Sequence, residues 1–93
     1  MKDVMVFYLK ECPYCVQARK ALENLISENP EYGKIKINWI EESENPQLAD
    51  EYDYYATPSM FIGKEKIYEA HLFEKYDECY AHVKEVLDMA LQG

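Results

Sequence analysis

Two cysteines, Cys12 and Cys15, are separated only by Pro13 and Tyr14, and thiols at this spacing carry the clearest chemistry in the chain. Such a pair can form and break a disulfide, or it can supply two ligands to a metal ion. The pair follows an apolar run at residues 4–9 and precedes a segment with helical periodicity. A strand, a C-x-x-C motif and a helix in this order indicate thiol–disulfide chemistry and argue against two inert buried thiols.

The two thiols are expected to differ, because they occupy different positions in the predicted helix. Cys12 lies at the cap and Pro13 at the first helical position, which proline favours. Unpaired backbone N–H groups and the helix dipole stabilise a negative sulfur there, and Lys10 can add a positive charge. Cys15 lies one turn further, on the apolar stripe, where we expect a shielded thiol with a higher pKa. Cys12 is therefore predicted to attack a substrate disulfide, and Cys15 to resolve the mixed disulfide.

A zinc site is the alternative interpretation of the cysteine pair. Zinc sites usually need four ligands, and only Cys79, His71 and His82 remain to complete one. Cys79 and His82 are three residues apart on one predicted helix, so they can share a face. The helical pattern nevertheless places Cys79 in the core as a small hydrophobic residue, and no familiar zinc spacing is completed. We predict no metal site and expect both histidines at the surface.

Size and charge limit the class of protein. The chain has 93 residues, which fits a single domain spanning 1–93, and its 48% hydrophobic content is ordinary for a globular fold. The formal net charge of −8 argues against nucleic acid and anionic membranes as partners. No stretch has the pattern of a signal peptide or the length of a membrane span. Three cysteines also do not suit a disulfide-stapled secreted scaffold, so we expect a cytoplasmic monomer.

Hydrophobic periodicity and turn residues predict seven elements in the order β-α-β-α-β-β-α. They are a buried strand at 4–9, a helix from 13 to 29, a strand at 34–39, a short helix at 46–52 capped by Asn45, a hairpin of strands at 59–62 and 65–70, and a helix at 73–91 with Phe73 on its apolar stripe. The first two strands should be parallel, because they are joined by a right-handed helical crossover. The fold class is therefore α/β, a four-stranded mixed sheet with helices on both faces.

The dipeptide Thr57-Pro58 stands immediately before the third predicted strand. Most X–Pro bonds in folded proteins are trans, so the residues alone predict a trans bond here. Three tyrosines lie just upstream, and they can either line a substrate groove or pack the short helix against the sheet. They are Tyr52, Tyr54 and Tyr55. Trp39 is predicted to lie in the core.

Two stretches of the chain, VFYLKECPYC at residues 6–15 and ATPSMFI at residues 56–62, resemble a glutaredoxin of the thioredoxin-fold superfamily. The resemblance spans nearly the whole chain in element order. Its most specific part is the C-P-Y-C motif combined with Thr-Pro before a short apolar strand. It implies a thioredoxin-like fold and a thiol–disulfide oxidoreductase that reduces protein or glutathione mixed disulfides and serves cell redox homeostasis and electron transport.

The resemblance also implies roles for individual residues. Cys12 becomes the exposed nucleophile, Cys15 the resolving thiol and Pro58 a cis-proline facing the disulfide. Thr57 offers its backbone to an extended peptide or to glutathione. The substrate-binding set implied by the resemblance is Lys10, Pro13, Tyr14, Thr57 and Pro58. In this set Lys10 favours the thiolate or meets a glutathione carboxylate, and Tyr14 is expected to face solvent at the rim of the site.

One departure from the family pattern concerns glutathione. Many glutaredoxins carry a Gly-Gly pair and an Asp after the hairpin, and these groups hold one end of glutathione. Residues 68–74 of this chain read YEAHLFE, and Glu69 would repel a glutathione carboxylate if it pointed the same way. The Trp-Cys-Gly-Pro-Cys signature of thioredoxins is absent as well. The expected partners are therefore disulfide-containing proteins, with glutathione or a flavin-dependent reductase as electron donor and no bound cofactor.

Two other functions compete with the redox enzyme. Some glutaredoxin-like proteins carry an iron–sulfur cluster between two chains, using the first motif cysteine and glutathione. Pro13 and the missing glycine pair count against that function here. The other alternative is a redox-inert binding module, which a reactive Cys12 at neutral pH would exclude.

Overall fold

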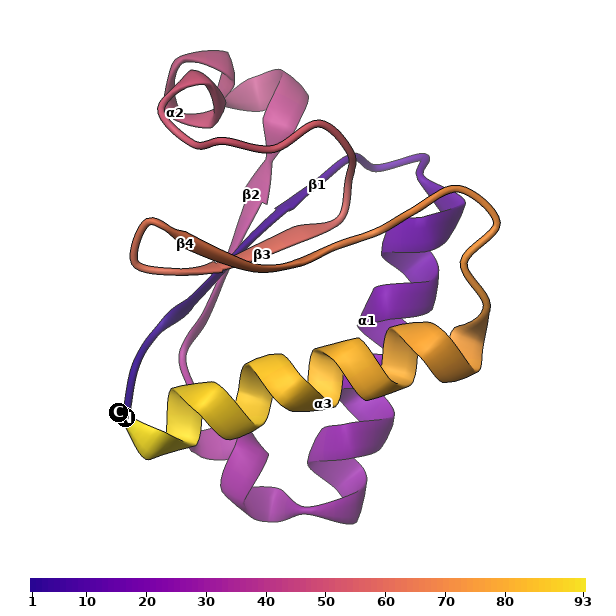
Figure 1. The fold of residues 1–93 in the computed structure, drawn as a ribbon, viewed down its shortest axis with the longest axis vertical. Coiled ribbons are helices and arrows are strands. Elements are labelled where there is room, and N and C mark those ends of the chain that lie inside the picture. The colour runs from indigo at the N-terminus through magenta and orange to yellow at the C-terminus, as the bar shows by residue number, and fades with distance from the viewer.

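A mixed sheet of four strands organises the molecule, and the computed structural model describes all residues from 1 to 93 (Figure 1). The strands are β1 (Val4–Tyr8), β2 (Ile37–Glu41), β3 (Ser59–Ile62) and β4 (Glu65–Glu69). Their spatial order is β2-β1-β3-β4, with β1 and β2 parallel and the remaining pairs antiparallel. The predicted four-stranded mixed sheet is confirmed.

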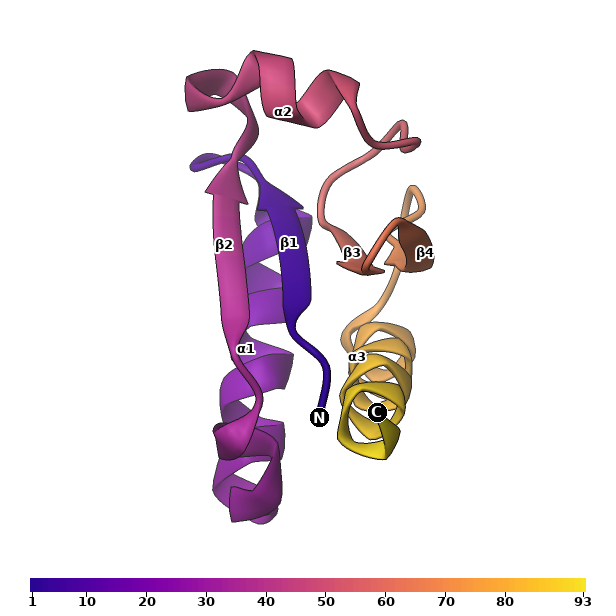
Figure 2. The same ribbon diagram turned by 90° about the vertical axis from the view of Figure 1, so that its left-hand side faces the viewer.

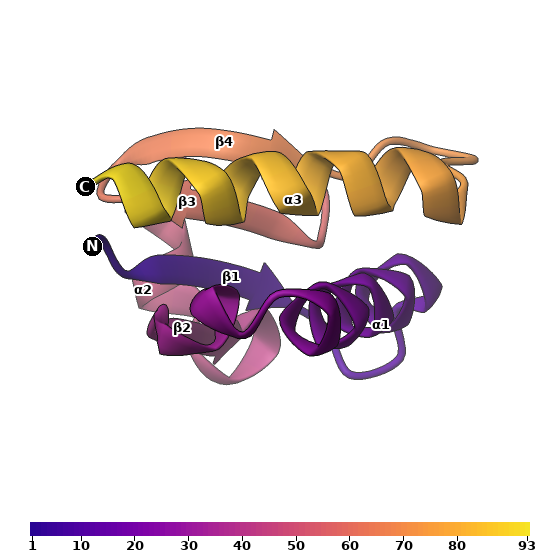
Figure 3. The same cartoon turned by 90° about the horizontal axis from the view of Figure 1, so that it is seen from below.

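Helices lie on both sides of this sheet. The long helices α1 (Pro13–Glu28) and α3 (Tyr76–Gln92) lie together on one side, and the short α2 (Pro46–Asp50) lies on the other, as the view from below shows (Figure 3). Two 3₁₀ turns, η1 (Pro30–Lys34) and η2 (Glu42–Glu44), flank β2. Figure 2 shows α2 beyond the end of the sheet at which β1 and β2 finish. The predicted α/β order is therefore confirmed. None of the helices combines the length and apolarity that crossing a bilayer requires.

The main core fills the space between the sheet and the two long helices. Val4 and Val6 of β1 point into it, because alternate residues of a strand face the same side. Small residues on α1, Ala18 and Ala21, are completely buried in this core. Cys79 is also completely buried in this core, as predicted.

A second, aromatic cluster covers the opposite face of the sheet. Phe7 and Phe61 are both buried, and their neighbours Val6 and Met60 point to the main core instead. The ring of Tyr52 lies 5.0 Å from those of both Phe7 and Phe61, and the ring of Tyr54 lies 4.9 Å from Phe7. For these two tyrosines, packing of the α2 segment against the sheet is confirmed, and both also border a pocket beside α2.

The second strand begins later than the sequence suggested. Residues 34–39 were expected to be extended, whereas β2 covers Ile37–Glu41. Pro30 starts η1, and the backbone N–H of Ile35 donates to the carbonyl of Tyr32 to close the turn. Tyr32 is buried and its hydroxyl donates to Asp88 of α3 at 2.5 Å, so tertiary contacts hold the turn where the alternating pattern indicates a strand.

The last helix also begins later, at Tyr76 instead of Phe73. Phe73 has a φ of 66° and is 79% exposed, so its expected place on the apolar stripe was wrong. Lys75 caps the helix, and its backbone N–H donates to the Glu78 carboxylate. The left-handed backbone at Phe73 turns the chain from β4 into α3, and it leaves the exposed residues Leu72 and Phe73 at the surface.

The two phenylalanines, one buried and one exposed, provide a test of this packing. Phe61→Ala removes a side chain that is 1% exposed and touches the aromatic cluster, so it should lower the free energy of unfolding by about 3–5 kcal/mol. The same substitution at Phe73 should change it by no more than about 0.5 kcal/mol. Urea unfolding of both variants measures the difference, and equal losses would contradict the assignment of the second core.

Candidate active site

Cys12 forms the N-cap of α1, as the sequence predicted. Its backbone is extended, with φ −99° and ψ 114°, and Pro13 occupies the first helical position. The Cys12 sulfur accepts a hydrogen bond from the backbone N–H of Cys15 at 3.2 Å. This N–H also donates to the Cys12 carbonyl at 3.0 Å, so the sulfur shares a donor at the start of the helix, where backbone N–H groups stabilise negative charge.

Thr57 lies against the same sulfur from the segment that precedes β3. Its hydroxyl donates to Cys12 Sγ at 3.6 Å, and its carbonyl accepts from the Cys12 thiol, also at 3.6 Å. The Thr57–Pro58 bond is cis, so the trans bond expected from the residues alone was wrong and the bond implied by the resemblance is the one observed. The backbone N–H of Thr57 makes no hydrogen bond within the protein, which leaves it available to a ligand beside Cys12.

Cys15 differs from Cys12 in its surroundings. Cys12 is half-exposed, whereas Cys15 is only 5% exposed. Burial, assisted by its hydrogen bond with Cys12, raises the pKa of Cys15 to about 12, and a backbone hydrogen bond at Leu9 offsets a part of this rise. Cys15 therefore remains a neutral thiol at physiological pH. The pair consists of one accessible sulfur that receives hydrogen bonds and one buried thiol.

An open pocket of about 500 Å³ lies beside Cys12. It is lined by Leu9, Lys10, Glu11, Cys12, Glu41, Ser43 and Thr57. The Lys10 ammonium forms an ion pair with Glu44 at 2.6 Å, and both side chains are more than half exposed. The contribution of Lys10 to thiolate formation stays a prediction. An exposed pair of this kind is worth only about 0–1 kcal/mol, so it can open when another charge approaches.

Glu41 gives this pocket a fixed negative group. The residue is 6% exposed, and its carboxylate accepts from the hydroxyl and backbone N–H of Ser43, both at 2.6 Å, and from the backbone N–H of Lys10 at 3.1 Å. The hydrogen bond from the Ser43 hydroxyl is the largest cause that holds the pKa of Glu41 below its usual value. Glu41 is therefore ionised at neutral pH, and the pocket is acidic although Lys10 stands at its edge.

Tyr14 and Gln17 connect the start of α1 to the segment before α3. Tyr14 is half-buried and packs against the core, and its hydroxyl accepts from the backbone N–H of Phe73 at 2.7 Å. The expectation that it faces solvent was therefore wrong, because the hydroxyl finds a partner in a loop 59 residues away. Gln17 donates to the carbonyl of Glu74 at 3.2 Å. Pro13 is exposed and lines a different pocket, together with Val16 and Tyr76.

A buried polar cluster behind this loop was not foreseen from the sequence. The Tyr68 hydroxyl donates to Glu74 at 2.7 Å and lies 3.4 Å from Cys79 Sγ, and Glu74 also accepts from the backbone N–H of His71 at 3.0 Å. Burial raises the pKa of both Tyr68 and Cys79. The acidic residue Glu74 is 4% exposed, which no periodicity indicates, because its burial depends on partners from β4 and the loop.

Glu69 is the other residue whose position the sequence did not indicate. Its carboxylate does not stand free to meet glutathione. It accepts from the backbone N–H groups of Tyr55 and Ala56, at 2.5 and 2.6 Å, immediately before Thr57. Strand alternation could have placed Glu69 on the face opposite Tyr68, but the loop that it meets there is set by tertiary structure.

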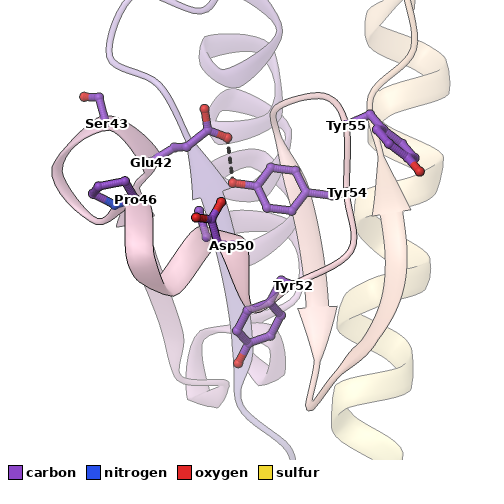
Figure 4. Close-up of a pocket in the computed structure, with 8 residues that line it drawn as sticks. Glu42, Ser43, Pro46, Asp50, Tyr52, Tyr54 and Tyr55 are labelled. Atoms are coloured by element: carbon purple, nitrogen blue, oxygen red, sulfur yellow. Dashed lines mark hydrogen bonds between the residues drawn. The ribbon is translucent and has the colours of Figure 1, made fainter.

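The tyrosine-lined pocket lies beside α2 and has a volume of about 470 Å³ (Figure 4). The Tyr54 hydroxyl donates to Glu42 at 2.6 Å, and Tyr55, which is 91% exposed, points away from Tyr54. Burial, followed by the contact with Glu42, raises the pKa of Tyr54. Ser43 borders both this pocket and the one beside Cys12, so the two pockets are neighbours.

The remaining candidates lie away from Cys12 or at the surface. His71 is exposed and 3.0 Å from Glu78, and His82 is exposed and stacks on Tyr68. Trp39 is half-buried instead of core, with the Arg19 guanidinium 4.0 Å above its ring. No three side chains of His, Cys, Asp or Glu are gathered in an arrangement that could hold a metal ion.

Comparisons with known proteins agree with this architecture. A family model described as a thioredoxin domain matches residues 2–69. The thioredoxin of Methanocaldococcus jannaschii is 32% identical over 60 residues, which cover 64% of this chain and 68% of that protein. Among solved structures, the match to a malarial protein covers 88% of this chain and 92% of that protein's chain, with 21% identity and a TM-score of 0.58. Oxidized glutaredoxin 2 from Chlamydomonas reinhardtii covers 98% of this chain and 80% of its own, with 24% identity and a TM-score of 0.51.

The family match includes the whole C-P-Y-C motif and Thr57-Pro58, since both lie within residues 2–69. At the identities observed, the two solved structures show a shared fold, and the resemblance to a glutaredoxin-like protein of the thioredoxin fold is confirmed at that level. The relatives and the cysteine pair support a thiol–disulfide oxidoreductase in general terms. By the extent of the family match and its identity to a thioredoxin, the chain belongs to the thioredoxin-domain family.

Proposed function

We propose that this protein reduces protein disulfides, with Cys12 as the nucleophile and Cys15 as the resolving thiol. The observation that carries the proposal is the asymmetry of the pair. Cys12 is half-exposed and accepts hydrogen bonds from the Cys15 N–H and the Thr57 hydroxyl, whereas Cys15 is buried with a pKa of about 12. Only one of the two sulfurs is accessible to a substrate and supported as an anion.

The reaction proceeds in two exchange steps. The Cys12 thiolate attacks one sulfur of the substrate disulfide, and the other substrate sulfur leaves as a thiolate that takes up a proton. Cys15 then loses its proton and attacks Cys12 Sγ in the mixed disulfide, and the second substrate thiolate departs. Two electrons pass from the dithiol to the substrate, which leaves with two thiols, and the enzyme is left with a Cys12–Cys15 disulfide. An external reductant must regenerate the dithiol.

The backbone of Thr57 is suited to align an extended substrate. Its N–H is free, and it stands next to the sulfur that attacks. An extended peptide can therefore pair with this backbone in the manner of strand addition, with Pro58 fixing the direction of the chain. Pro13 and Tyr14 support the same surface from the motif, because Pro13 begins the helix and Tyr14 holds the loop at Phe73.

The charge beside Cys12 favours protein disulfides over glutathione. Glutathione carries two carboxylates, and the pocket presents Glu11 and the buried Glu41. The pocket holds one ammonium, that of Lys10, in an exposed ion pair with Glu44, and the two pocket carboxylates outnumber it. Because like charges at an interface suppress binding, we infer that a dedicated, flavin-dependent reductase supplies the electrons. The cytoplasmic location, the monomeric state and the lack of a bound cofactor remain predictions.

Substitution of the cysteines separates their roles. Cys12→Ser should abolish reduction of a disulfide substrate, because no accessible nucleophile remains. Cys15→Ser should accumulate a stable mixed disulfide with the substrate, detectable by mass spectrometry of the intact protein. Cys79→Ala, which removes the third thiol from the core, is the matched control and should keep turnover within about twofold. Full activity of Cys12→Ser would exclude the mechanism.

The raised pKa of Cys15 predicts a pH dependence. In a Cys12→Ser, Cys79→Ala double variant, Cys15 is the only thiol, and burial, the largest cause of its raised pKa, is retained although the contribution of the Cys12 thiol is lost. The rate of alkylation by iodoacetamide should therefore rise about tenfold for each pH unit between pH 7 and pH 10. A rate that levels off near pH 9 would mean that burial does not raise this pKa.

The choice between glutathione and protein disulfides can be measured directly. With glutathione and glutathione reductase as the donor system, kcat/KM for a small mixed disulfide should be about tenfold or more below that for a protein disulfide served by a flavin-dependent reductase. Glu11→Gln should improve the glutathione reaction, whereas Glu65→Gln, at the far end of β4, should not. Fast Cys12-dependent turnover with glutathione would show instead that the protein works as a glutaredoxin.

A further inference from the structure

The last residue of β4, Glu69, holds the loop that leads to Thr57. One carboxylate oxygen accepts from two consecutive backbone N–H groups, those of Tyr55 at 2.5 Å and Ala56 at 2.6 Å. The other oxygen accepts from the Lys66 ammonium at 2.7 Å. The Glu69 side chain is only 19% exposed, so these three donors replace most of its contact with water.

The peptide groups around Ala56 are fixed from both sides. Glu69 holds the Ala56 N–H, and the hydroxyl of the fully buried Ser59 donates to the Ala56 carbonyl at 2.5 Å. On the other side of Thr57, the Pro58 carbonyl accepts from the backbone N–H of Ala70 at 3.0 Å. Thr57 therefore lies between two residues whose backbones are tied to the hairpin of β3 and β4.

Thr57 itself has no such tie to the hairpin. Its carbonyl and hydroxyl contact Cys12 Sγ, and its N–H is free. The position of these three groups therefore depends on the residues on either side. An exposed loop residue such as Tyr55, which is 91% exposed, has little packing of its own to restrain it. The Glu69 carboxylate restrains the backbone on the Tyr55 side of Thr57, and it makes no hydrogen bond with the reacting sulfur of Cys12.

We propose that Glu69 is a positioning residue of the active site, which clamps the Tyr55–Ala56 backbone so that Thr57 presents its free N–H to an extended substrate beside Cys12. The inference rests on the proposed function, because it gives Glu69 a role in binding the disulfide substrate. Without the hydrogen bonds to Glu69, the loop must be ordered when the substrate binds. The conformational entropy lost in ordering it weakens substrate binding and raises KM. The chemical step at Cys12 does not involve Glu69.

The charge state of Glu69 is consistent with this role. Burial alone would raise its pKa, but the hydrogen bonds from Lys66, Tyr55 and Ala56 outweigh burial and hold the pKa below its usual value. The carboxylate is therefore ionised at neutral pH and acts as an acceptor for all three donors. A charged acceptor forms stronger hydrogen bonds with backbone N–H groups than a neutral one does.

The test uses a short disulfide-containing peptide as substrate and the full chain with three substitutions at position 69. Glu69→Ala should raise KM about tenfold with kcat within about twofold, because the backbone at Tyr55 and Ala56 must then be ordered when the substrate binds. Glu69→Gln keeps an oxygen that can accept both N–H groups and should restore most of the loss. Glu69→Asp keeps the charge but shortens the reach, and should raise KM as well. Glu65→Ala, which removes the same charge from the same strand, is the matched control and should behave as the unchanged protein.

Hydrogen exchange of the Tyr55 and Ala56 amides provides a readout that does not depend on turnover. Both amides should be protected in the unchanged protein and in Glu69→Gln, and should lose protection in Glu69→Ala and Glu69→Asp. Protection that survives Glu69→Ala would overturn the clamp, and lost protection with an unchanged KM would overturn the positioning role. If Glu69→Ala does not fold, Glu69→Asp decides the same question. An unchanged protein without disulfide reductase activity would overturn the proposed function as well, whereas normal activity with an unaffected Glu69→Ala overturns this inference alone.

Discussion

The contact between Cys12 and Thr57 is the constraint on which the rest of the structure depends. The two residues are 45 positions apart, and their side chains meet only if the start of α1 and the loop before β3 lie at the same end of the sheet. The central position of β1 satisfies this condition. The end of β1 leads into α1, and one side of β1 pairs with β3. The parallel neighbour β2 then has to lie on the remaining side, where the crossover through α1 delivers it.

The two residues of this contact are held in place by separate sets of hydrogen bonds. Neither set involves the Cys12 sulfur. The start of α1 is tied to the loop before α3, through Tyr14 to the Phe73 backbone and through Gln17 to the Glu74 carbonyl. The Thr57 segment is tied to the hairpin through Glu69 and Ser59. Since the hairpin also leads into the loop before α3, both supports converge on β4 and the residues that follow it. In this chain the segment after β4, where many glutaredoxins hold glutathione with glycines, makes structural contacts through the Glu74 side chain and the Phe73 backbone, while the side chains of Leu72 and Phe73 are exposed.

The sequence predicted what depends on neighbours along the chain, and it missed what depends on distant partners. The cap at Cys12, the first turn at Pro13 and the hairpin of β3 and β4 are local, and all were found. The burial of Glu74, the contacts of Glu69 and the hydroxyl contact of Tyr14 need partners from other elements, so no periodicity signals them. The same reason explains the misplaced start of β2, where contacts of Tyr32 with α3 override an alternating pattern. The cis bond at Pro58 followed from family resemblance, because its own residues favour the commoner isomer.

The acidic residues near Cys12 should oppose the negative charge that its sulfur carries when it attacks a disulfide. The distances over which charges and hydrogen bonds act explain how both can be present. Residues 41–53 hold six acidic residues and no Lys or Arg, and this segment borders the Cys12 pocket through Glu41 and Ser43. Most of these carboxylates are in contact with solvent, so they act weakly on the sulfur and are screened further by salt, while the charge of the buried Glu41 is shared with three hydrogen-bond donors. The donors that meet Cys12 Sγ directly, the Cys15 N–H and the Thr57 hydroxyl, act at contact distance and are not screened in this way. Local hydrogen bonds can therefore support the nucleophile while the wider acidic surface selects which disulfides approach it.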